Sequence, residues 1–451
     1  MLPQSMFRLS ETMRARQGID TDLRHVWSRV GGRRSAQKGK HRWVLEAFRP
    51  GWGRRVRVVY FPCFMTLGLG EESAMLYRRF GKTELQVSAL SFGAMRIPDG
   101  SDENAVATIR RAVEVGINHL ETARGYGRSE ELLGLAMPDL PRDKLIITTK
   151  IGPTETANEM WRYIFESLKR MRVNRIDNFG IHGINNRDIL RQTLKKGGCL
   201  DAVRRAMGEG VIGHVGFSTH GPVDVIIEAI DSGEFESVNL HYYYFNQRNA
   251  PAVRRARELD MGVFIISPTD KGGQLFKAPE KLRRLVAPHT PIQFNDRWLL
   301  SDPDVHTLSV GASAPEDFDE HVAVADSAGP LAAWEIAVVE RLEGEMRRAL
   351  GETRCTVCHE CMPCPENITI PEMLRLRNVA RALDMVEFGR YRYNLFSHGG
   401  HWFPGEQATA CTECGECLPR CPEKLAIPAL LMDAHRLLIG DPESHLYARN
   451  D

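Results

Sequence analysis

Short apolar runs alternate with amphipathic segments over residues 75–325 of this chain. Between the runs, apolar residues recur at the spacing of one helix face, in the segments 102–115, 129–136, 158–171, 201–209, 223–232, 250–259 and 315–325. The runs themselves have the composition of buried strands: "ALSFGAM", "NHLETA", "LIITTKI", "IDNFGIH", "IGHVGFS", "SVNLHYY", "GVFIISP" and "HTLSVGA". Eight strands alternating with helices over about 250 residues predict an α/β fold, a parallel (β/α)8 TIM barrel.

A doubly wound parallel sheet is the alternative fold for this alternation. No Gly-x-Gly-x-x-Gly turn follows the first expected strand, which removes the usual dinucleotide signature of that fold. After the barrel, the amphipathic stretch "LAAWEIAVVERLEGEMRRAL" predicts a long helix. We therefore expect a barrel over 75–328, a linker helix over 329–350 and a second domain over 351–451.

Composition and charge narrow the class of protein. The 451 residues, 43% of them hydrophobic, can fill the cores of two or three domains. A net charge of +1 gives no global field that favours nucleic acid. Because the sequence has neither a run of about 18 apolar residues nor a compact apolar signal core, we expect no membrane span and a cytoplasmic location.

Residues 1–74 form a basic extension without a sustained helix or strand period. Lys and Arg outnumber Asp and Glu there by 14 to 6. One interpretation is an arm for nucleic acid or lipid. The other, which we favour because a defined pattern begins abruptly at Met75, is a disordered extension or a start codon assigned too early.

Eight of the ten cysteines lie in two similar stretches about 56 residues apart, "CTVCHECMPCPENITIP" from Cys355 and "CTECGECLPRCPEKLAIP" from Cys411. The match continues past the cysteines, so the tail is a duplicated unit. Only Cys63 and Cys199 lie elsewhere. Such clustering in a long chain favours metal binding in a reducing compartment over disulfides.

The cysteine spacing favours iron–sulfur clusters over zinc. Three thiolates at i, i+3 and i+6 on a turning loop can each face a different iron of a cubane, and a fourth cysteine followed by proline binds the other cluster in two-cluster ferredoxins. Zinc sites usually take two Cys-x-x-Cys pairs separated by a longer loop. We therefore predict two [4Fe–4S] clusters. Their ligands are Cys355, Cys358, Cys361, Cys364, Cys411, Cys414, Cys417 and Cys421.

Residues 351–435 resemble the bacterial two-cluster ferredoxin domain, which implies a small α+β ferredoxin-like fold. The resemblance also implies that the two copies exchange their last ligand. One cluster is then held by Cys355, Cys358, Cys361 and Cys421, and the other by Cys411, Cys414, Cys417 and Cys364. The first copy has two residues, not three, before its last cysteine, and an insert containing "FSHGGHWFPG" separates the copies.

Four ionisable residues lie at or just after the ends of three successive strands of the expected barrel, where they face one pocket: Glu121 and nearby Tyr126, Lys150, and His182. A tyrosine, with a pKa near 10, can donate a proton at neutral pH when a neighbouring cation such as Lys150 stabilises its phenolate. Glu121 can fix that ammonium, and His182 can orient a substrate oxygen. Each residue alone has an ordinary structural explanation, but their shared placement predicts a site that protonates a carbonyl oxygen as a hydride reaches its carbon.

The stretches "GINHLETARGYGRSEELLG", "TTK", "IDNFGIHGIN", "GHVGFSTH" and "LSVGASAPEDFDEHV" make residues 75–325 resemble the aldo-keto reductases. With its tail, the chain is similar to the branch of that family that carries a C-terminal ferredoxin-like domain. The resemblance implies an NAD(P)(H)-dependent carbonyl reductase in which Tyr126 is the acid, Lys150 assists it and His182 orients the substrate. The family has an aspartate where this chain has Glu121.

The resemblance also implies a nucleotide site. Its residues are Ser218, Thr219, Asn239, Ser267, Gly311, Ala312 and Ser313. Ser218 and Asn239 match positions that contact the nicotinamide carboxamide, and the residues 311–313 enter a final helix whose free amides suit a phosphate. The chain departs from the family at Thr219, where an asparagine is frequent, and at Ile266, where many members place a ring. No basic clamp for a 2′-phosphate is evident, and His321 replaces the usual asparagine there, so the cofactor is NADP(H) or NAD(H).

The two halves pose a problem of electron number, because a nicotinamide gives up two electrons and a cluster accepts one. The chain has no flavin motif. We predict an oxidoreductase whose barrel reduces a small carbonyl substrate and whose tail exchanges electrons with an external carrier, a ferredoxin or flavoprotein. Two alternatives stay open: a barrel that is fed by the clusters and no longer uses nicotinamide, and an electron-transfer or redox-sensing protein with a non-catalytic barrel. The sequence also leaves open whether the tail covers the barrel mouth.

Overall fold

The computed structural model describes residues 43–47, 56–60, 75–97, 100–327 and 329–440. The chain divides into two units, Met1–Gly70 and Glu71–Asp451. In the first, β1 (Trp43–Ala47) pairs antiparallel with β2 (Val56–Tyr60), a pairing that the sequence did not lead us to expect. The rest of the basic extension that we predicted over residues 1–74 lies outside the described residues.

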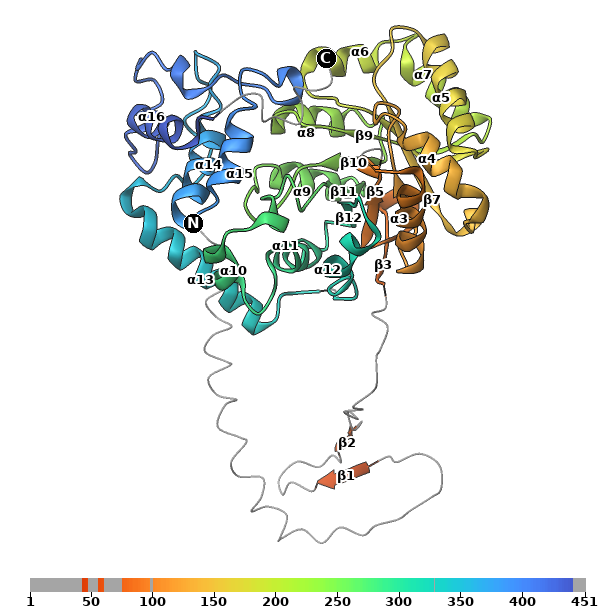
Figure 1. The fold of residues 1–451 in the computed structure, drawn as a ribbon, viewed down its shortest axis with the longest axis horizontal. Coiled ribbons are helices and arrows are strands. Elements are labelled where there is room, and N and C mark those ends of the chain that lie inside the picture. The colour runs from red at the N-terminus through yellow and green to blue at the C-terminus, as the bar shows by residue number, and fades with distance from the viewer. Residues whose placement is uncertain (1–42, 48–55, 61–74, 98–99, 328, 441–451) are drawn as a thin grey trace. The chain divides into compact units, whose positions relative to one another are not determined.

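Eight parallel strands close into a barrel in the second unit, which confirms the predicted fold (Figure 1). The strands follow one another in chain order, and the last pairs with the first. They are β5 (Leu90–Gly93), β6 (His119–Glu121), β7 (Ile146–Ile151), β8 (Ile176–Ile181), β9 (Ile212–Ser218), β10 (Ser237–Leu240), β11 (Gly262–Ile266) and β12 (Thr307–Gly311). Nearly all of their residues are buried, as expected for strands covered on both faces.

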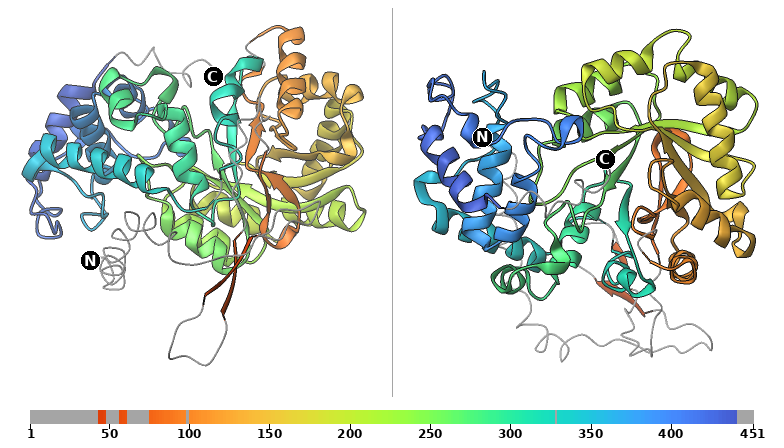
Figure 2. Two further views of the ribbon diagram at one scale, coloured as in Figure 1. Left: turned by 90° about the horizontal axis from the view of Figure 1, so that it is seen from below. Right: turned by 45° about the horizontal axis from the view of Figure 1, so that its top comes forward.

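Helices surround the strands (Figure 2). They are α3 (Asp102–Glu114), α4 (Ser129–Ala136), α5 (Ala157–Met171), α6 (Arg187–Leu194), α7 (Cys199–Gly208), α8 (Val223–Asp231), α9 (Ala250–Glu258), α10 (Glu280–Val286), α11 (Pro291–Leu300) and α12 (Asp319–Val322). The sequence did not predict α6, α10 and α11; α11 is buried around most of its circumference, so it lacks a clear amphipathic period. The helix predicted over 315–325 is instead a 3-10 turn, η7 (Pro315–Phe318), followed by the single turn of α12.

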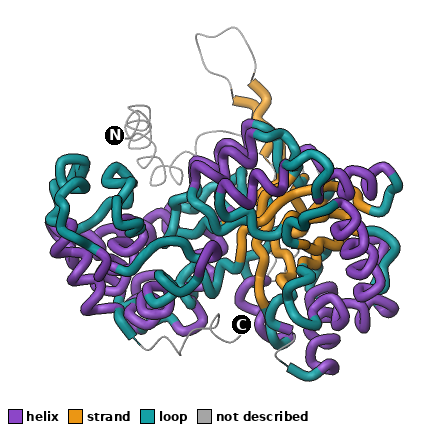
Figure 3. The backbone as a smooth tube through the Cα atoms, turned by 90° about the horizontal axis from the view of Figure 1, so that it is seen from above, coloured by secondary structure: helices purple, strands orange, loops and turns teal. Residues whose placement is uncertain are grey.

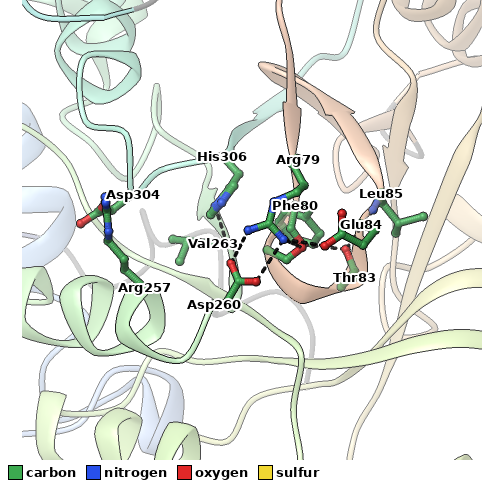
Figure 4. A network of polar contacts seen from close by, with 11 residues as sticks. Arg79, Phe80, Thr83, Glu84, Leu85, Arg257, Asp260, Val263, Asp304 and His306 are labelled. Atoms are coloured by element: carbon green, nitrogen blue, oxygen red, sulfur yellow. Dashed lines mark hydrogen bonds and ion pairs between the residues drawn. The ribbon is translucent and has the colours of Figure 1, made fainter.

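A hairpin closes the amino-terminal end of the barrel. Its strands are β3 (Tyr77–Arg79) and β4 (Gln86–Ser88), and Phe80 between them packs against Phe264 of β11 with ring centroids 6.0 Å apart. Arg79 forms ion pairs with Asp260, which precedes β11, and with Glu84 at 2.7 Å (Figure 4). With this end closed, the carboxyl ends of the strands are the face at which a substrate can enter.

The C-terminal part of the second unit consists of helices and loops (Figure 3). Its helices are α13 (Ala333–Leu350), α14 (Ile370–Leu383), α15 (Val386–Tyr393) and α16 (Ile427–Leu438). A second hydrophobic core joins this part to the barrel, with Phe245 from the loop after β10, Phe294 from α11, Val338 from α13 and Leu374 from α14. The helices of the described ranges do not include one that is long and apolar enough to cross a lipid bilayer.

Candidate functional site

A buried ion pair lies at the carboxyl ends of β6 and β7. The Lys150 ammonium donates to Glu121 Oε1 and, at 2.8 Å, to the carbonyl oxygen of Thr122. The hydroxyl of Ser309, from β12, donates to the second oxygen of Glu121 at 3.1 Å. The side chains of Lys150 and Glu121 are only 2% and 6% exposed. The extra methylene of Glu121 therefore still allows the carboxylate to hold the lysine, the geometry expected of the shorter aspartate.

Tyr126 and His182 complete the group of four predicted residues. The Lys150 nitrogen lies 5.0 Å from the centre of the Tyr126 ring. The rings of Tyr126 and His182 meet edge to face, with centroids 5.5 Å apart. The structure thus brings all four side chains together at one place on the barrel mouth.

The electrostatics of this group follow from its burial. Desolvation lowers the pKa of Lys150 well below its usual value, and the charge of Lys271 adds to that effect. The ion pair with Glu121 acts in the opposite direction, because it favours the charged lysine. Desolvation also lowers the pKa of His182 to about 3, with Lys150 and then Lys271 as further causes. His182 is therefore neutral at pH 7 and can offer one N–H and one lone pair.

The insert between the two cysteine stretches reaches the barrel mouth. The Trp402 ring lies edge to face against His182, with centroids 5.3 Å apart, and against His220 at 5.1 Å. Its Cη2 atom approaches Gly183 so closely that a Cβ atom there would lie 2.7 Å away. Gly183 also has a positive φ of 81°, so two constraints favour glycine. The C-terminal part therefore covers part of the barrel mouth, which the sequence had left open.

The residues expected to hold a nicotinamide lie at neighbouring strand ends. Ser218 of β9 pairs in register with Asn239 of β10, and both are buried. The Ser218 hydroxyl accepts from the N–H of Gly183 at 3.1 Å and keeps its own proton to donate. The Thr219 hydroxyl, by contrast, donates to the carbonyl of Ile184 at 2.7 Å and also accepts from the Gly221 N–H at 3.0 Å. Thr219 thus holds the loops together.

The expected phosphate end of the site differs from the prediction. Gly311 ends β12 and is exposed, and Ala312 is buried behind it. The amides that we expected to be free donate instead to the carboxylate of Asp317, from Ser313 at 2.8 Å and from Ala314 at 3.1 Å. The Ser313 hydroxyl donates to the same oxygen at 3.1 Å. As it stands, this end of the site carries a negative charge where a phosphate would need donors.

Two further predicted positions frame this region. Ser267 follows β11 in the left-handed conformation, with φ of 43°. His321 is buried between the Asp296 carboxylate, which its Nδ1 contacts, and the Thr269 hydroxyl, 3.2 Å from its Nε2. His321 therefore has partners on both ring nitrogens.

The eight predicted cysteine ligands line two separate cavities. One is lined by Cys355, Cys358, Cys361 and Cys421. The other is lined by Cys364, Cys411, Cys414 and Cys417. Each cavity thus combines three cysteines of one copy with the last cysteine of the other.

The backbone around the two cavities repeats in detail. Val357 and Glu413, each two residues after the first cysteine of its copy, both have φ of 57°. A β-branched residue rarely adopts this conformation, so the loop imposes it. The N–H groups of Val357 and Leu425 point at the sulfurs of Cys355 and Cys421, at 3.4 and 3.5 Å. Such N–H donors suit sulfurs that carry negative charge in a cluster.

The helices that follow the cysteine loops also correspond. α14 and α16 each begin at an Ile-Pro pair, with proline in the first turn where its missing N–H costs nothing. In the described part of the chain, no three His, Cys, Asp or Glu side chains converge as they would on a single metal ion. The four cysteine sulfurs around each cavity are the donor set that a [4Fe–4S] cluster requires. Cys199 is buried in the barrel, and Cys63 lies outside the described residues.

Comparison with known proteins supports both halves. The aldo/keto reductase family matches residues 89–343, more than half of the chain. The chain belongs to the aldo/keto reductase family. A 4Fe-4S dicluster domain matches residues 354–426, which places an iron–sulfur domain behind the barrel of this aldo/keto reductase.

Individual relatives agree with this assignment. L-galactose dehydrogenase from Arabidopsis thaliana is 32% identical over 281 residues, which are 54% of this chain and 86% of that protein. The oxidoreductase YqkF from Bacillus subtilis is 27% identical and matches 56% of this chain and 92% of its own length. L-glyceraldehyde 3-phosphate reductase from Escherichia coli K12 is 31% identical over 173 residues, 33% of this chain and 46% of that one. The structure of aldo-keto reductase AKR11C1 from Bacillus halodurans has a TM-score of 0.52 at 24% identity, covers 59% of this chain and 96% of its own, and shows the shared fold.

Three residues at the barrel mouth did not emerge from the sequence: His220, Trp402 and Asp317. His220 stands two residues after the end of a strand, a position at which polar side chains reach the pocket. Trp402 belongs to the insert that interrupts the cysteine repeat. Asp317 could not be singled out, because an acidic residue in a first helical turn is ordinary.

Proposed function

We propose that the barrel interconverts a carbonyl group and an alcohol, with Tyr126 as the proton donor to the carbonyl oxygen. The observation that carries this proposal is the buried Glu121–Lys150 pair, whose ammonium lies 5.0 Å from the Tyr126 ring. A nicotinamide cofactor, NAD(H) or NADP(H), would supply or take the hydride when bound.

Each of the four residues has a defined task in this proposal. Tyr126 transfers its phenolic proton to the carbonyl oxygen, and Lys150 stabilises the phenolate that remains. Glu121 keeps the Lys150 ammonium charged and in place despite its burial. His182 is neutral and donates its N–H to the substrate oxygen, which fixes the carbonyl beside the tyrosine. Solvent then returns the proton to Tyr126.

For nucleotide binding we propose Ser218 and Asn239 as contacts of the nicotinamide carboxamide, with Ser267 and the segment 311–313 on the phosphate side. Thr219 supports this site through its two hydrogen bonds to neighbouring loops. The nicotinamide end has suitable donors and acceptors, whereas the phosphate end does not fit a phosphate while Asp317 holds its amides.

We propose further that the two cysteine cavities each hold a [4Fe–4S] cluster with the ligand sets that line them. When bound, such clusters exchange single electrons, which an external carrier, a ferredoxin or flavoprotein, would deliver or remove. Replacing Cys421 or Cys364 with serine tests the crossed ligation. Iron content should fall from roughly eight toward roughly four per chain, and the two variants should lose different clusters by electron paramagnetic resonance. Loss of the same cluster in both variants would contradict this assignment.

One anaerobic titration tests the barrel's activity. Adding NADH or NADPH with a panel of aldehydes to the iron-loaded protein, and following nicotinamide and cluster absorbance together, separates the candidates. Nicotinamide oxidation with unchanged clusters supports the reductase. Absence of any nicotinamide binding would rule it out.

A second candidate function is a reductase in which the clusters feed electrons to the barrel substrate without a nicotinamide. The carboxylate of Asp317 on the amides of Ser313 and Ala314 favours this candidate, because it disfavours a bound phosphate. Cluster oxidation by a carbonyl substrate in the absence of nicotinamide would support it. Clusters that stay reduced under those conditions would exclude it.

We also propose a class of substrate, a cellular location and domain boundaries for this protein. The names of two relatives, L-galactose dehydrogenase and L-glyceraldehyde 3-phosphate reductase, support a small carbonyl compound as the substrate. Clustered thiolates need a reducing compartment, which supports a cytoplasmic location. We keep the division into a barrel over 75–328, a linker helix over 329–350 and an iron–sulfur domain over 351–451.

A further inference from the structure

A second histidine flanks the same indole as His182. His220 lies two residues beyond the end of β9, and its side chain is only partly buried. Its backbone N–H donates to the side-chain oxygen of Asn185 at 2.7 Å, and the amide of Asn185 also contacts the His401 ring at 3.0 Å. Trp402 packs edge to face on both His220 and His182, so the two imidazoles contact one ring at the barrel mouth.

A series of hydrogen bonds determines which ring nitrogen atoms of His241 and His220 carry a proton. The Tyr243 hydroxyl bonds to the carbonyl oxygen of Ile266, which can only accept, so the tyrosine must donate there. Having used its proton, the Tyr243 oxygen accepts from Nδ1–H of His241 at 2.6 Å. The second nitrogen of His241 lies 2.9 Å from Nδ1 of His220.

The imidazoles of His220 and His241 are both neutral, which determines where the remaining protons of this hydrogen-bonded network lie. Burial lowers the pKa of His220 and of His241 well below the usual value, and the charge of Lys271 contributes in both cases. A neutral His241 with its proton on Nδ1 carries a lone pair on Nε2, so Nδ1–H of His220 donates to it. The Nε2 atom of His220 is then left with a lone pair. No hydrogen bond to this atom comes from the residues that the structure describes.

The surroundings indicate which group this lone pair can meet. Arg248 donates to the carbonyl oxygen of His220 at 3.2 Å. The positive charges of Lys271, Arg392 and Arg248 all act on the His220 ring. A cationic partner such as an ammonium group is disfavoured among these charges. A neutral O–H group is not, and it is the donor that a neutral imidazole nitrogen can accept at little electrostatic cost.

We propose that Nε2 of His220 accepts a hydrogen bond from a hydroxyl group of the substrate, so that the barrel takes a hydroxylated carbonyl compound. The carbonyl lies at Tyr126 and His182, and the hydroxyl lies at His220, which contacts the same Trp402 ring as His182. His241 and Tyr243 are positioning residues that keep the accepting nitrogen unprotonated. This inference rests on the proposed carbonyl chemistry of the same pocket.

A pair of substrates of equal length tests this inference in the iron-loaded full chain. Glyceraldehyde carries hydroxyl groups next to its carbonyl, and propionaldehyde does not. His220→Phe keeps a ring against Trp402 but removes the acceptor. We expect it to lower kcat/KM for glyceraldehyde about tenfold or more, as for a lost hydrogen bond in a desolvated site, and to change that for propionaldehyde less than about threefold.

Two companion variants guard against a general loss of structure. His220→Gln keeps an acceptor oxygen, and it should recover part of the preference for glyceraldehyde. His214→Gln changes a histidine on the same strand β9 that bonds to Glu236 at 2.6 Å, and it should leave the preference unchanged. Equal losses with both aldehydes, or an unchanged preference in His220→Phe, would overturn the inference.

A measurement without turnover separates this inference from the proposed activity. Diethyl pyrocarbonate reacts with unprotonated imidazole nitrogen, so His220 should be labelled at pH 7, as read by peptide mass spectrometry. Hydroxyacetone should slow this labelling at least threefold, and acetone at the same concentration should not. Protection that is equal or absent would overturn the role of His220. A protein that oxidises no nicotinamide with either aldehyde, yet shows selective protection, would contradict the proposed activity alone.

Discussion

The two sides of the barrel mouth each hold a carboxylate, with opposite consequences. On the reaction side, Glu121 at the end of β6 is paired with the Lys150 ammonium in full burial. On the helix side, Asp317 in the 3-10 turn η7 is held by the neutral N–H groups of Ser313 and Ala314. A carboxylate paired with a charge is fixed by the cost of separating the two, whereas one held by amides competes directly with any anionic ligand. The reaction side thus has a fixed ammonium group beside the proton donor, whereas the negative charge on the helix side disfavours a bound phosphate.

The largest effect should come from the proton donor on the reaction side. Tyr126→Phe removes the phenolic proton and should lower kcat by about 10²- to 10⁴-fold, the usual contribution of a positioned acid. Steady-state kinetics with an aldehyde that the wild type reduces measure this loss. Tyr163→Phe, on helix α5, removes a hydroxyl that bonds to Glu159 at 3.0 Å and serves as the control. Activity that survives in Tyr126→Phe would remove Tyr126 from its assigned task.

Glu121→Gln tests the buried pair itself. It leaves a fully buried lysine without its counter-charge, which should lower the free energy of unfolding by roughly 3–5 kcal/mol. Glu121→Asp keeps the charge and should lose less. Denaturant unfolding of the iron-loaded proteins measures both. A loss below about 1 kcal/mol in Glu121→Gln would mean that Lys150 is neutral in the folded protein.

On the helix side, Asp317→Asn removes the negative charge and keeps the shape. The dissociation constant of NADPH, followed by its fluorescence, should fall roughly three- to tenfold, the scale of one charge at a helix start. Asp319→Asn, which alters the ion pair with Arg111 at 3.2 Å, is a matched control two residues away. If neither variant binds a nicotinamide cofactor, that result supports the candidate in which the clusters supply the electrons. It would also mean that the helix side does not bind a nucleotide phosphate even without the charge of Asp317.

The burial of His182 makes the stability of the protein depend on pH. His182 has a folded-state pKa of about 3, below the ordinary value of 6.5, so the unfolded chain binds its proton first. Its contribution to stability is complete above pH 6.5 and is lost as pH falls from about 6.5 toward 3. In His182→Gln, the free energy of unfolding should change less steeply over that window, by at most about 1.4 kcal/mol per pH unit. His398→Gln, at an exposed position of the insert, should keep the wild-type slope. Equal slopes in both variants would contradict the low pKa of His182.

The sequence predicted those features that depend on residues close together along the chain. Strand identity is local, so all eight strands were found, and topology then placed Glu121, Lys150 and His182 at one face. The resemblance to two-cluster ferredoxins implied the same grouping of thiols that lines the two cavities. Contacts made by packing of distant parts of the chain could not be predicted: Trp402 contacts His182 although 219 residues separate them in the sequence.

Polar details of the mouth were unpredictable for a different reason. The amides of Ser313 and Ala314 were expected to be free because helix starts usually offer donors. Whether a nearby side chain takes them depends on the rotamer of Asp317 and on the short 3-10 turn that replaces the predicted helix. The tautomer of His220 depends on two further residues and a carbonyl, so it follows only from the assembled network.

The second hydrophobic core has a consequence for the order in which this protein is made. Phe245, Leu282 of α10 and Phe294 of α11 pack in that core with Leu431 and Leu438 near the end of the described chain. A ribosome delivers the barrel first, at roughly 5–20 residues per second. These apolar side chains therefore stay uncovered until the last helix has emerged. During that interval the nascent barrel exposes an apolar surface, and the C-terminal helices bury this surface when they pack against it.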